Sequence, residues 1–286
     1  MTIRHLDATQ ISGRLTPAAA VDALEAALRR GLDPDADPPR SIVDVPAGQM
    51  LVMPSGAAGH PVVKVVTAGG DPRIQGVCVA FDPTTLAPVA LLDGIAVTNL
   101  RTAAVSALAI RHLAVPDARR LVVFGRGPQA HAHLEAVRAV RPIAEVTQLG
   151  RDDDDDAARD AAVAGADVIC CCTTARTPLF DGGLVADRAT VVAIGSHEPD
   201  AREVDDELVA RASVVVESPP TALREAGDVV LAVRAGRLRP ERLIGLAALV
   251  GGQQRPVPGR PRLFKSTGMA WEDAVIVDAI LAGSGA

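Results

Sequence analysis

The spacing of apolar residues divides the chain into a sheet-forming part and a part in which strands and helices alternate. Apolar residues first recur at helical intervals over residues 16–30, where Thr16 is the expected cap and Pro17 the first helical residue. Short Val-rich runs separated by Pro, Gly and Asp follow, and they predict an antiparallel sheet. These runs cover residues 41–45, 50–53, 62–67, 76–82 and 89–93. Helical spacing returns over residues 98–114.

From residue 119 onward, runs with strand character alternate with runs of helical character. The predicted strands are 121–124, 145–149, 167–172, 190–195 and 213–217. The predicted helices are 131–140, 157–164, 205–212, smaller ones beyond Thr221, one at 241–248 and a closing one at 270–281. Residues 251–261 are rich in Pro and Gly, which predicts a linker. The alternation predicts a parallel sheet with helices on both faces.

Composition and charge narrow the class of protein. The chain has 286 residues, 48% of them hydrophobic, which is enough for the cores of one large or two medium domains. A net charge of -6 and an aromatic content of 2% leave neither a basic surface nor stacking platforms for nucleic acid. No apolar run is long enough to span a bilayer, and residues 1–7 lack the apolar core of a signal peptide. We therefore expect a cytoplasmic protein without membrane or nucleic-acid partners.

Two clusters of metal-binding residue types are better explained without a metal. Cys170, Cys171 and Cys172 fall in a predicted buried strand, whose successive side chains point to opposite faces, so they are expected to be small buried residues without disulfides. Residues 152–156 are five consecutive aspartates whose side chains cannot converge on one ion in ordinary backbone geometry. This acidic run is expected to be a solvated loop leading into a helix.

A glycine-containing turn follows the predicted strand 121–124. Its sequence, Gly125-Arg126-Gly127-Pro128-Gln129-Ala130, has the GxGxxA pattern and precedes an Ala-rich helical run. In that setting the glycines let the backbone turn sharply and approach a pyrophosphate, whose charge then meets the amides at the start of the helix. The turn predicts a bound dinucleotide, with an ordinary Gly-rich turn as the alternative.

These stretches, taken together and in order, resemble the ornithine cyclodeaminase and μ-crystallin family over nearly the whole chain. The stretches that carry the resemblance are Arg40 and residues 51–54, 63–66, 91–108, 125–131, 193–205 and 263–273. The resemblance implies an α/β fold in which a shortened Rossmann-type, doubly wound parallel sheet is inserted into an α+β domain. Residues 1–116 and 263–286 would form this substrate-binding and dimerisation domain, and residues 117–262 the dinucleotide-binding domain. A homodimer is therefore expected, and the Val-rich sheet has too little helix of its own to cover both faces.

The resemblance also implies a nicotinamide cofactor and a small amino or imino acid as substrate. The expected cofactor-binding residues are Thr102, Gly125, Gly127, Pro128, Gln129, Ala130, Arg151, Thr173, Gly195 and Lys265. The family's grip on the substrate carboxylate corresponds to Arg40, Lys64 and Arg101. A guanidinium can fix the plane of a carboxylate while an ammonium supplies a compact second charge. The alternative is that these are surface cations, although Lys64 interrupts an otherwise apolar strand.

Two positions depart from the pattern of the true cyclodeaminases. The acidic residue that holds the distal amine of their substrate corresponds to Leu51, and their catalytic aspartate corresponds to His197. Without an anionic partner for a second amine, and without that carboxylate, the cyclodeaminase reaction is disfavoured. His197 follows a predicted strand and has an ordinary pKa near neutrality, so it is a candidate for proton transfer. Packing or capping of the next helix is the alternative for His197.

The coenzyme preference depends on the end of the second nucleotide-domain strand. Arg151 replaces the acidic residue that would bind a ribose hydroxyl, and its guanidinium could pair with a 2′-phosphate. NADP(H) is therefore slightly favoured over NAD(H), although the acidic run would repel that phosphate if it lay close. Only one helical segment fits between residues 151 and 165, so a strand expected at the edge of the sheet is missing.

The sequence thus predicts an NAD(P)H-dependent oxidoreductase, most simply a ketimine reductase or an amino-acid dehydrogenase, acting at the α-carbon. Arg40 and Arg101 would hold the carboxylate, Lys64 would also orient or polarise the imine, and His197 or a water would deliver the proton. Two rivals are a cyclodeaminase that recycles its NAD and a nucleotide-bound binding protein with a decayed enzyme site.

Overall fold

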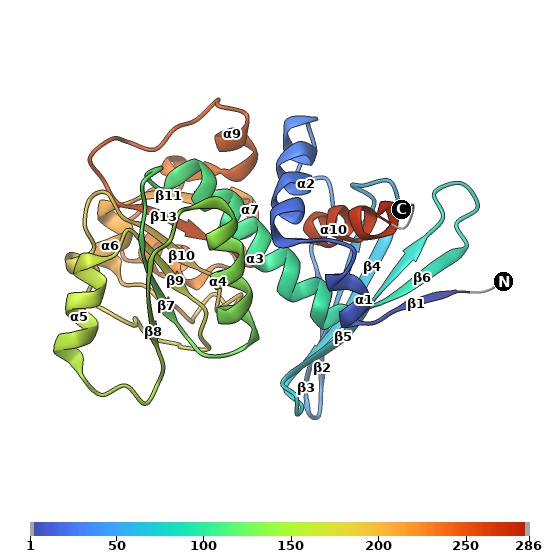
Figure 1. Cartoon of the computed structure of the whole chain (residues 1–286), viewed down its shortest axis with the longest axis horizontal. Helices are drawn as coiled ribbons and strands as arrows, with labels where there is room; N and C mark the ends of the chain where they lie inside the picture. Colours follow the sequence, from blue (N-terminus) through green and yellow to red (C-terminus); the bar gives the residue numbers. More distant parts are fainter. Residues whose placement is uncertain (1–2, 284–286) are drawn as a thin grey trace. The chain divides into compact units, whose positions relative to one another are not determined.

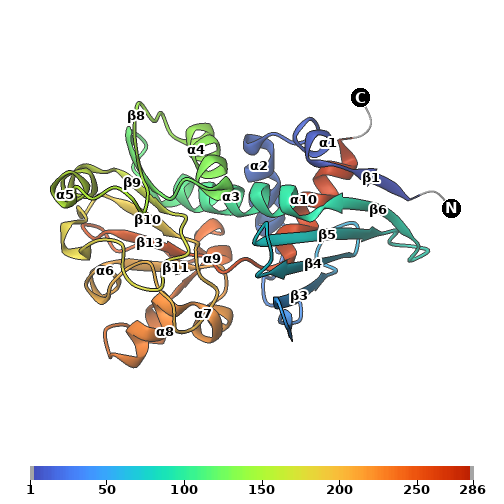
Figure 2. The same ribbon diagram turned by 90° about the horizontal axis from the view of Figure 1, so that it is seen from below.

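A computed structural model describes residues 3–283 of the chain. The described part divides into two compact units, one ending at Val105 and resuming at Met269, the other comprising Ser106–Gly268. The first unit has a six-stranded sheet and the second a seven-stranded sheet (Figures 1 and 2). A mixed α/β architecture with a largely parallel sheet in the second unit agrees with the predicted fold class.

The sheet of the first unit is antiparallel over the predicted strands. These are β2 (Ser41–Val45), β3 (Gly48–Ser55), β4 (Val62–Ala68), β5 (Ile74–Phe81) and β6 (Pro88–Asp93), paired in that order. A further strand, β1 (Arg4–Leu6), joins the edge beside β6 in parallel and was not predicted, because three residues carry too little pattern. Along β4 the burial alternates, with Val62, Lys64 and Val66 on the buried face.

Helices from both ends of the chain cover that buried face. The first is α2 (Pro17–Arg29), which starts as predicted: the Thr16 hydroxyl accepts a hydrogen bond from the amide of Ala19, and Pro17 is the first helical residue. The second is α10 (Ala270–Ala282), which contacts α2, β3 and β4 and lies beside α2 in Figure 1. A short helix, α1 (Ala8–Ser12), precedes them. The core of the first unit is therefore built from α2 near the start of the described chain and from α10 near its end, which packs against α2 and the sheet.

The helix α3 (Gly94–Leu113) begins earlier than the predicted start at residue 98. The carboxylate of Asp93 accepts hydrogen bonds from the amides of Ile95 and Ala96, which satisfies donors that would otherwise be unpaired at a helix start. The prediction placed the start too late because residues 94–97 show no helical repeat of their own. The division between the two units falls within this helix.

All strand pairs of the second unit are parallel, as predicted. The strands are β7 (Arg120–Phe124), β8 (Glu145–Leu149), β9 (Val168–Cys171), β10 (Thr190–Ala193), β11 (Ser213–Val216), β12 (Ile244–Gly245) and β13 (Arg262–Lys265). Their order across the sheet is β12-β11-β13-β10-β9-β7-β8. Since β8 lies at the edge, the absent strand leaves the centre of the sheet intact.

Two predictions for the last third of this unit were wrong. Residues 241–248 are not one helix: they contain the end of a 3-10 turn (Pro240–Arg242), the short strand β12 and the start of α9 (Leu246–Val250). The pairing of Ile244 with Val215 of β11 overrides the local helical spacing. The strand β13 was also missed, and it lies in the centre of the sheet between β10 and β11.

Helices cover both faces of this sheet, as Figure 2 shows for α4 on one side and α7 and α8 on the other. They are α4 (Pro128–Val140), α5 (Asp156–Gly165), α6 (Asp206–Arg211), α7 (Pro219–Glu225) and α8 (Gly227–Arg234), with a 3-10 turn at Gly182–Leu184. Cys170 and Cys171 are both fully buried, and Cys171 packs in the core formed with α5 to α8. None of the helices within residues 3–283 is both long and apolar enough to cross a membrane.

Candidate functional site

Lys64 is a buried cation on a strand of the first unit. It lies on β4 between Met53 of β3 and Cys78 of β5, and its side chain is 1% exposed. Its Nζ atom lies 2.7 Å from Oδ2 of Asp273 and donates a hydrogen bond to Oδ1 at 2.8 Å. Burial, followed by the charge of Arg101, lowers the pKa of Lys64, while Asp273 opposes both effects. A surface role for Lys64 is therefore wrong.

Arg101 joins the same buried cluster from α3. Its Nη1 donates to Oε2 of Glu272 at 2.9 Å, and its Nε lies 3.4 Å from Oδ1 of Asp273. The structure thus brings Lys64 and Arg101 together through two carboxylates in the first turn of α10. Sequence reasoning gave Glu272 and Asp273 no role. The available signal was a pair of adjacent acids inside an otherwise apolar helix.

Three other residues of the first unit were singled out by the sequence, namely Arg40, Thr102 and Leu51. Arg40 is half-buried and directly precedes β2. Thr102 is buried on α3 next to Arg101, and its hydroxyl has no hydrogen-bond partner within residues 3–283. Leu51 is buried on β3 and pairs with Val66 of β4, so an apolar side chain occupies the position where the cyclodeaminases have an acid.

In the glycine turn of the second unit, the backbone at Gly125 lies very close to a neighbouring strand end. Gly125 has φ +112, and a Cβ there would meet the carbonyl oxygen of Cys172, so this position requires glycine. At Gly127, by contrast, a Cβ would have no atom within 4 Å. Gly127 also caps α4 without a side-chain hydrogen bond, and Pro128 is the first residue of the helix. Open space before uncapped amides is what the phosphates of a dinucleotide need, so these residues fit the implied cofactor.

The first turn of α4 is fixed by a buried histidine. His133 is fully buried, with Nδ1 2.8 Å from the carbonyl oxygen of Gln129 and Nε2 2.9 Å from the hydroxyl of Ser106. Burial lowers the pKa of His133 to about 4, so the ring is neutral at pH 7. A neutral ring donates from Nδ1 to Gln129 and accepts at Nε2 from Ser106. Ala130 is buried in the same turn.

Beyond the end of β8, an aspartate of the acidic run contacts the glycine turn. Arg151 is exposed, but Arg126 of the glycine turn reaches Asp153, with Nη2 3.0 and 2.7 Å from its two carboxylate oxygens. The same carboxylate accepts from the amide of Gly150. One aspartate of the acidic run thus connects the run to the glycine turn. Asp155 caps the start of α5 by accepting a hydrogen bond from the amide of Ala158, in agreement with the predicted loop leading into a helix.

The remaining predicted residues follow the carboxyl ends of three neighbouring strands. Thr173 lies beyond β9, Gly195 and His197 lie beyond β10, and Lys265 ends β13. The ammonium group of Lys265 is buried, lies 2.9 Å from Oδ2 of Asp228 and donates to the carbonyl oxygen of Ser196 at 2.8 Å. His197 is half-buried in its loop. No group of three His, Cys, Asp or Glu side chains within residues 3–283 could hold a metal ion.

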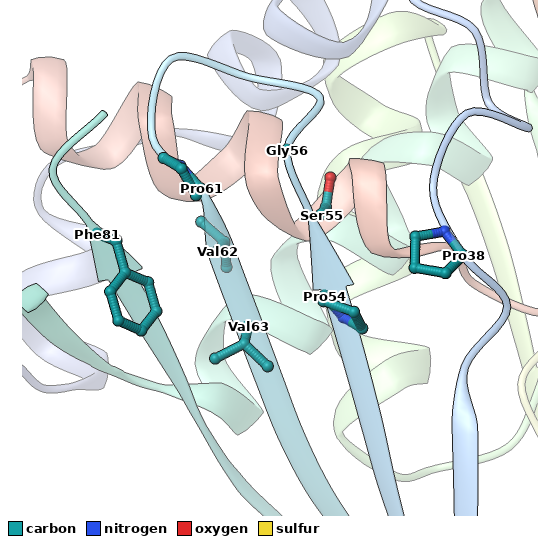
Figure 3. A pocket seen from close by; sticks show the side chains of 8 residues that line it. All are labelled: Pro38, Pro54, Ser55, Gly56, Pro61, Val62, Val63 and Phe81. Atoms are coloured by element: carbon teal, nitrogen blue, oxygen red, sulfur yellow. The ribbon is translucent and has the colours of Figure 1, made fainter. Parts of the chain in front are cut away.

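A pocket on the first unit is formed by residues of β3, β4 and β5 and by neighbouring loops, and Lys64 is not part of its lining. Its volume is about 280 Å³, and it is lined by Pro38, Pro54, Ser55, Gly56, Pro61, Val62, Val63 and Phe81 (Figure 3). None of these side chains is charged, so nothing in the lining would hold a carboxylate or a phosphate. The pocket is apolar surface rather than a candidate substrate site.

Comparisons with known proteins identify relatives over most of the chain. The model of the ornithine cyclodeaminase/mu-crystallin family matches residues 4–162 and 156–282. Ketimine reductase mu-crystallin from Rattus norvegicus is 32% identical over 283 residues, which cover 89% of this chain and 88% of the relative. A Delta(1)-pyrroline-2-carboxylate/Delta(1)-piperideine-2-carboxylate reductase from Azospirillum brasilense is 35% identical over 259 residues, which cover 82% and 81%.

A solved structure extends the likeness to three dimensions. Delta(1)-pyrroline-2-carboxylate reductase from Thermococcus litoralis, in complex with NADH and L-proline, matches with a TM-score of 0.90 at 26% identity. The match covers 99% of this chain and 97% of that chain. The predicted fold and the predicted family are both confirmed.

Proposed function

Because the chain belongs to the ornithine cyclodeaminase/mu-crystallin family, we propose that it is an NAD(P)H-dependent reductase of imino acids. The observation that carries the proposal is the buried pair of cations, Lys64 and Arg101, in the first unit. Burying two positive charges is costly, and the pairs with Asp273 and Glu272 offset that cost. An imino acid presents a further carboxylate that the two cations can bind. The curated relatives that reduce cyclic imino acids make a Delta(1)-pyrroline-2-carboxylate-like compound the first substrate to test.

The carboxylate grip combines geometry with charge. The guanidinium of Arg101 is a planar group with five donors, it already pairs with Glu272, and this geometry suits binding of a carboxylate in its plane. Lys64 adds a compact charge held in place by Asp273. Arg40 is proposed as the third cation of the grip. A substrate fixed in this way loses its freedom to rotate, which lowers the barrier of the chemical step.

Reduction of the C=N bond needs a hydride at the carbon and a proton at the nitrogen. The nicotinamide cofactor supplies the hydride when bound. We assign the proton to His197, directly or through a water, because imidazole is the side-chain type most often used for general acid catalysis. Lys64 has a lowered pKa and can polarise the imine from its buried position. The residues of the glycine turn, Gly125, Gly127, Pro128, Gln129 and Ala130, are proposed to bind the cofactor together with Thr102, Arg151, Thr173, Gly195 and Lys265.

Ornithine cyclodeamination is the rival reaction, and Leu51 argues against it. A second amine would face a buried leucine in place of an acid, which offers neither charge nor a hydrogen bond. His197 cannot replace the carboxylate that the cyclodeaminases use at that position. A binding protein with a decayed site is the other rival, and it has no need for a buried Lys64–Asp273 pair.

The coenzyme preference is proposed from the end of β8, where NADP(H) stays slightly favoured over NAD(H). Arg151 is exposed there, and Arg126 adds a second guanidinium. Arg126 already forms an ion pair with Asp153, so its attraction for a 2′-phosphate is reduced and the preference for NADP(H) is expected to be modest. Arg151→Ala should lower the ratio of NADPH affinity to NADH affinity. An unchanged ratio would show that Arg151 does not contact the 2′-phosphate.

A homodimer is proposed from the outer face of the first sheet. Val43 and Val77 lie on the face opposite Lys64 and are 45% and 40% exposed. Exposed β-branched residues on one sheet face are typical of a surface that a partner covers. Sedimentation of Val43→Asp with Val77→Asp should give a monomer where the unmodified protein gives a dimer. A monomeric unmodified protein at micromolar concentration would contradict this proposal.

The test of the reaction is a steady-state assay with paired substrates. Cyclic imino acids should oxidise NADH or NADPH and yield the corresponding amino acid, whereas ornithine should yield no proline. Proline formed from ornithine without net change in NAD would restore the cyclodeaminase interpretation. Cofactor binding without turnover of any imino or amino acid would support the binding protein.

A further inference from the structure

One buried carboxylate joins two loops that carry predicted cofactor-binding residues. Glu203 is fully buried, and its Oε1 accepts from the amide of Thr173 at 2.9 Å and from the hydroxyl of Thr173 at 2.7 Å. Its Oε2 accepts from the amide of Gly195 at 2.7 Å. The loops after β9 and β10 are therefore held at a fixed spacing by a single side chain.

The contact at Gly195 leaves no room for another residue. A Cβ at that position would collide with Oε1 of Glu203 and with the carbonyl oxygen of Thr173. The absence of a side chain thus permits the approach of the carboxylate. The glycine at position 195 is needed for the hydrogen bond from its amide to Glu203. This contact was predicted from the sequence for neither residue.

The surroundings of Glu203 contain both signs of charge. The carboxylate of Asp228 on α8 accepts from the amides of Glu203 and Val204 at 2.7 and 2.9 Å. Lys265 of β13 pairs with Asp228 and so connects a third strand end. The thiols of Cys171 and Cys172 are further titratable groups that interact with Glu203, and burial raises the pKa of each.

This environment makes Glu203 sensitive to pH. Burial is the main cause that raises the pKa of Glu203 to about 7, and Asp228 adds to it. Lys265 and the hydrogen bonds from Thr173 and Gly195 act in the opposite direction. Ionised and neutral forms of Glu203 are thus both present close to neutral pH.

We propose that Glu203 is a positioning residue that, as a carboxylate, holds the Thr173 and Gly195 loops in the conformation that binds the dinucleotide. The inference rests on the proposed function, since it takes these loops to line the cofactor site. An ionised carboxylate accepts all three hydrogen bonds, whereas a protonated oxygen is itself a donor and repels the donor that faces it. Protonation of Glu203 therefore releases one loop and weakens cofactor binding.

The test measures the dissociation constant of NADH, by its fluorescence, between about pH 6 and about pH 8. Binding to the unmodified protein should weaken on acidification, approaching a loss of about tenfold per pH unit once Glu203 is largely protonated. Glu203→Gln should bind more weakly than the unmodified protein at about pH 8 and show no such pH dependence. The matched control is Glu207→Gln, an exposed glutamate on α6 paired with Arg237, which should behave as the unmodified protein.

A second measurement needs no variant and covers the case in which Glu203→Gln does not fold. Hydrogen exchange of peptides containing Thr173 and Gly195 should show lower protection at about pH 6 than at about pH 8, after correction for intrinsic rates. Equal protection, or an unchanged pH dependence of NADH binding in a folded Glu203→Gln, would overturn the role of Glu203 while leaving the proposed reductase intact. Loss of imino acid reduction with intact, Glu203-dependent NADH binding would instead remove the reductase alone. Absence of dinucleotide binding at every pH would remove both.

Discussion

The ammonium group of Lys64 lies 2.7 Å from the carboxylate of Asp273, and each side chain is 1% exposed. The two residues are 209 positions apart in the sequence, and Arg101 is joined to Glu272 over 171 positions. Lys64 and Arg101 are therefore neutralised by α10, and a substrate carboxylate must share them with the resident carboxylates. This sharing explains how two buried charges are compatible with a stable fold.

Removal of one partner of this pair is expected to destabilise the first unit. Lys64→Met removes the nearer cation of buried Asp273 and leaves it with Arg101 at 3.4 Å, which is expected to cost up to about 3–5 kcal/mol of unfolding free energy. Urea unfolding measures the change. The matched double variant, Lys64→Met with Asp273→Asn, removes both charges and should recover part of the loss. Equal stability of Lys64→Met and the unmodified protein would show that the ion pair contributes nothing.

The open space at Gly127 makes a charge-specific test of cofactor binding. Gly127→Asp should abolish binding of NADH and NADPH, because its carboxylate would repel the pyrophosphate. Gly127→Ala is the control, since its Cβ has no neighbour within 4 Å and its φ of -83 suits any residue. Fluorescence titration of NADH with both variants distinguishes the effect of the added negative charge from the effect of the added side-chain volume. Binding by Gly127→Asp with unmodified affinity would remove the cofactor from this turn.

The buried His133 predicts a loss of stability in mild acid. Its pKa of about 4 in the folded protein lies below the ordinary value of 6.5, so only the unfolded chain takes up a proton between these values. The stability that His133 contributes is present above about pH 6.5 and is lost as the pH falls towards 4, by up to a few kcal/mol. His133→Gln should show a flatter pH dependence in thermal unfolding. Parallel curves for the two proteins would contradict a neutral, buried imidazole.

His197 is expected to affect the rate more than binding. His197→Ala should lower turnover by about 100- to 10,000-fold with little change in substrate affinity, as expected for a lost general acid. Lys64→Ala should impair carboxylate binding and turnover together. His5→Ala changes an exposed histidine on β1 and serves as the control. Unchanged turnover in His197→Ala would leave His197 with a packing or capping role.

The sequence predicted the regular elements best where a local period was strong. The strands β2 and β8 have the predicted bounds, because apolar runs and turn residues delimit them. The strand β13 was missed, since its four residues Arg-Leu-Phe-Lys end in charges and follow a loop. Its place between β10 and β11 is set by pairing across the sheet, which no local pattern contains.

The candidate site could be predicted only as a set of functional residue types. Lys64 drew attention because a cation interrupts an apolar strand, but its partner Asp273 is determined by the packing of α10 on β4. Glu203 was overlooked for a similar reason: an acid before a helix suggests solvent, and only the folded sheet buries it beneath Thr173 and Gly195. Burial and long-range pairing decide the chemistry of such groups.

Transfer of hydrogen from the cofactor to the α-carbon is the central claim, and isotope transfer measures it directly. The protein is incubated with a cyclic imino acid and NADH or NADPH that carries deuterium at the transferable position of the nicotinamide, and the product is analysed by mass spectrometry. The account predicts an amino acid with one deuterium at the α-carbon, formed in equal amount to the oxidised cofactor. An amino acid without deuterium, or no product while the cofactor stays bound and reduced, would contradict it.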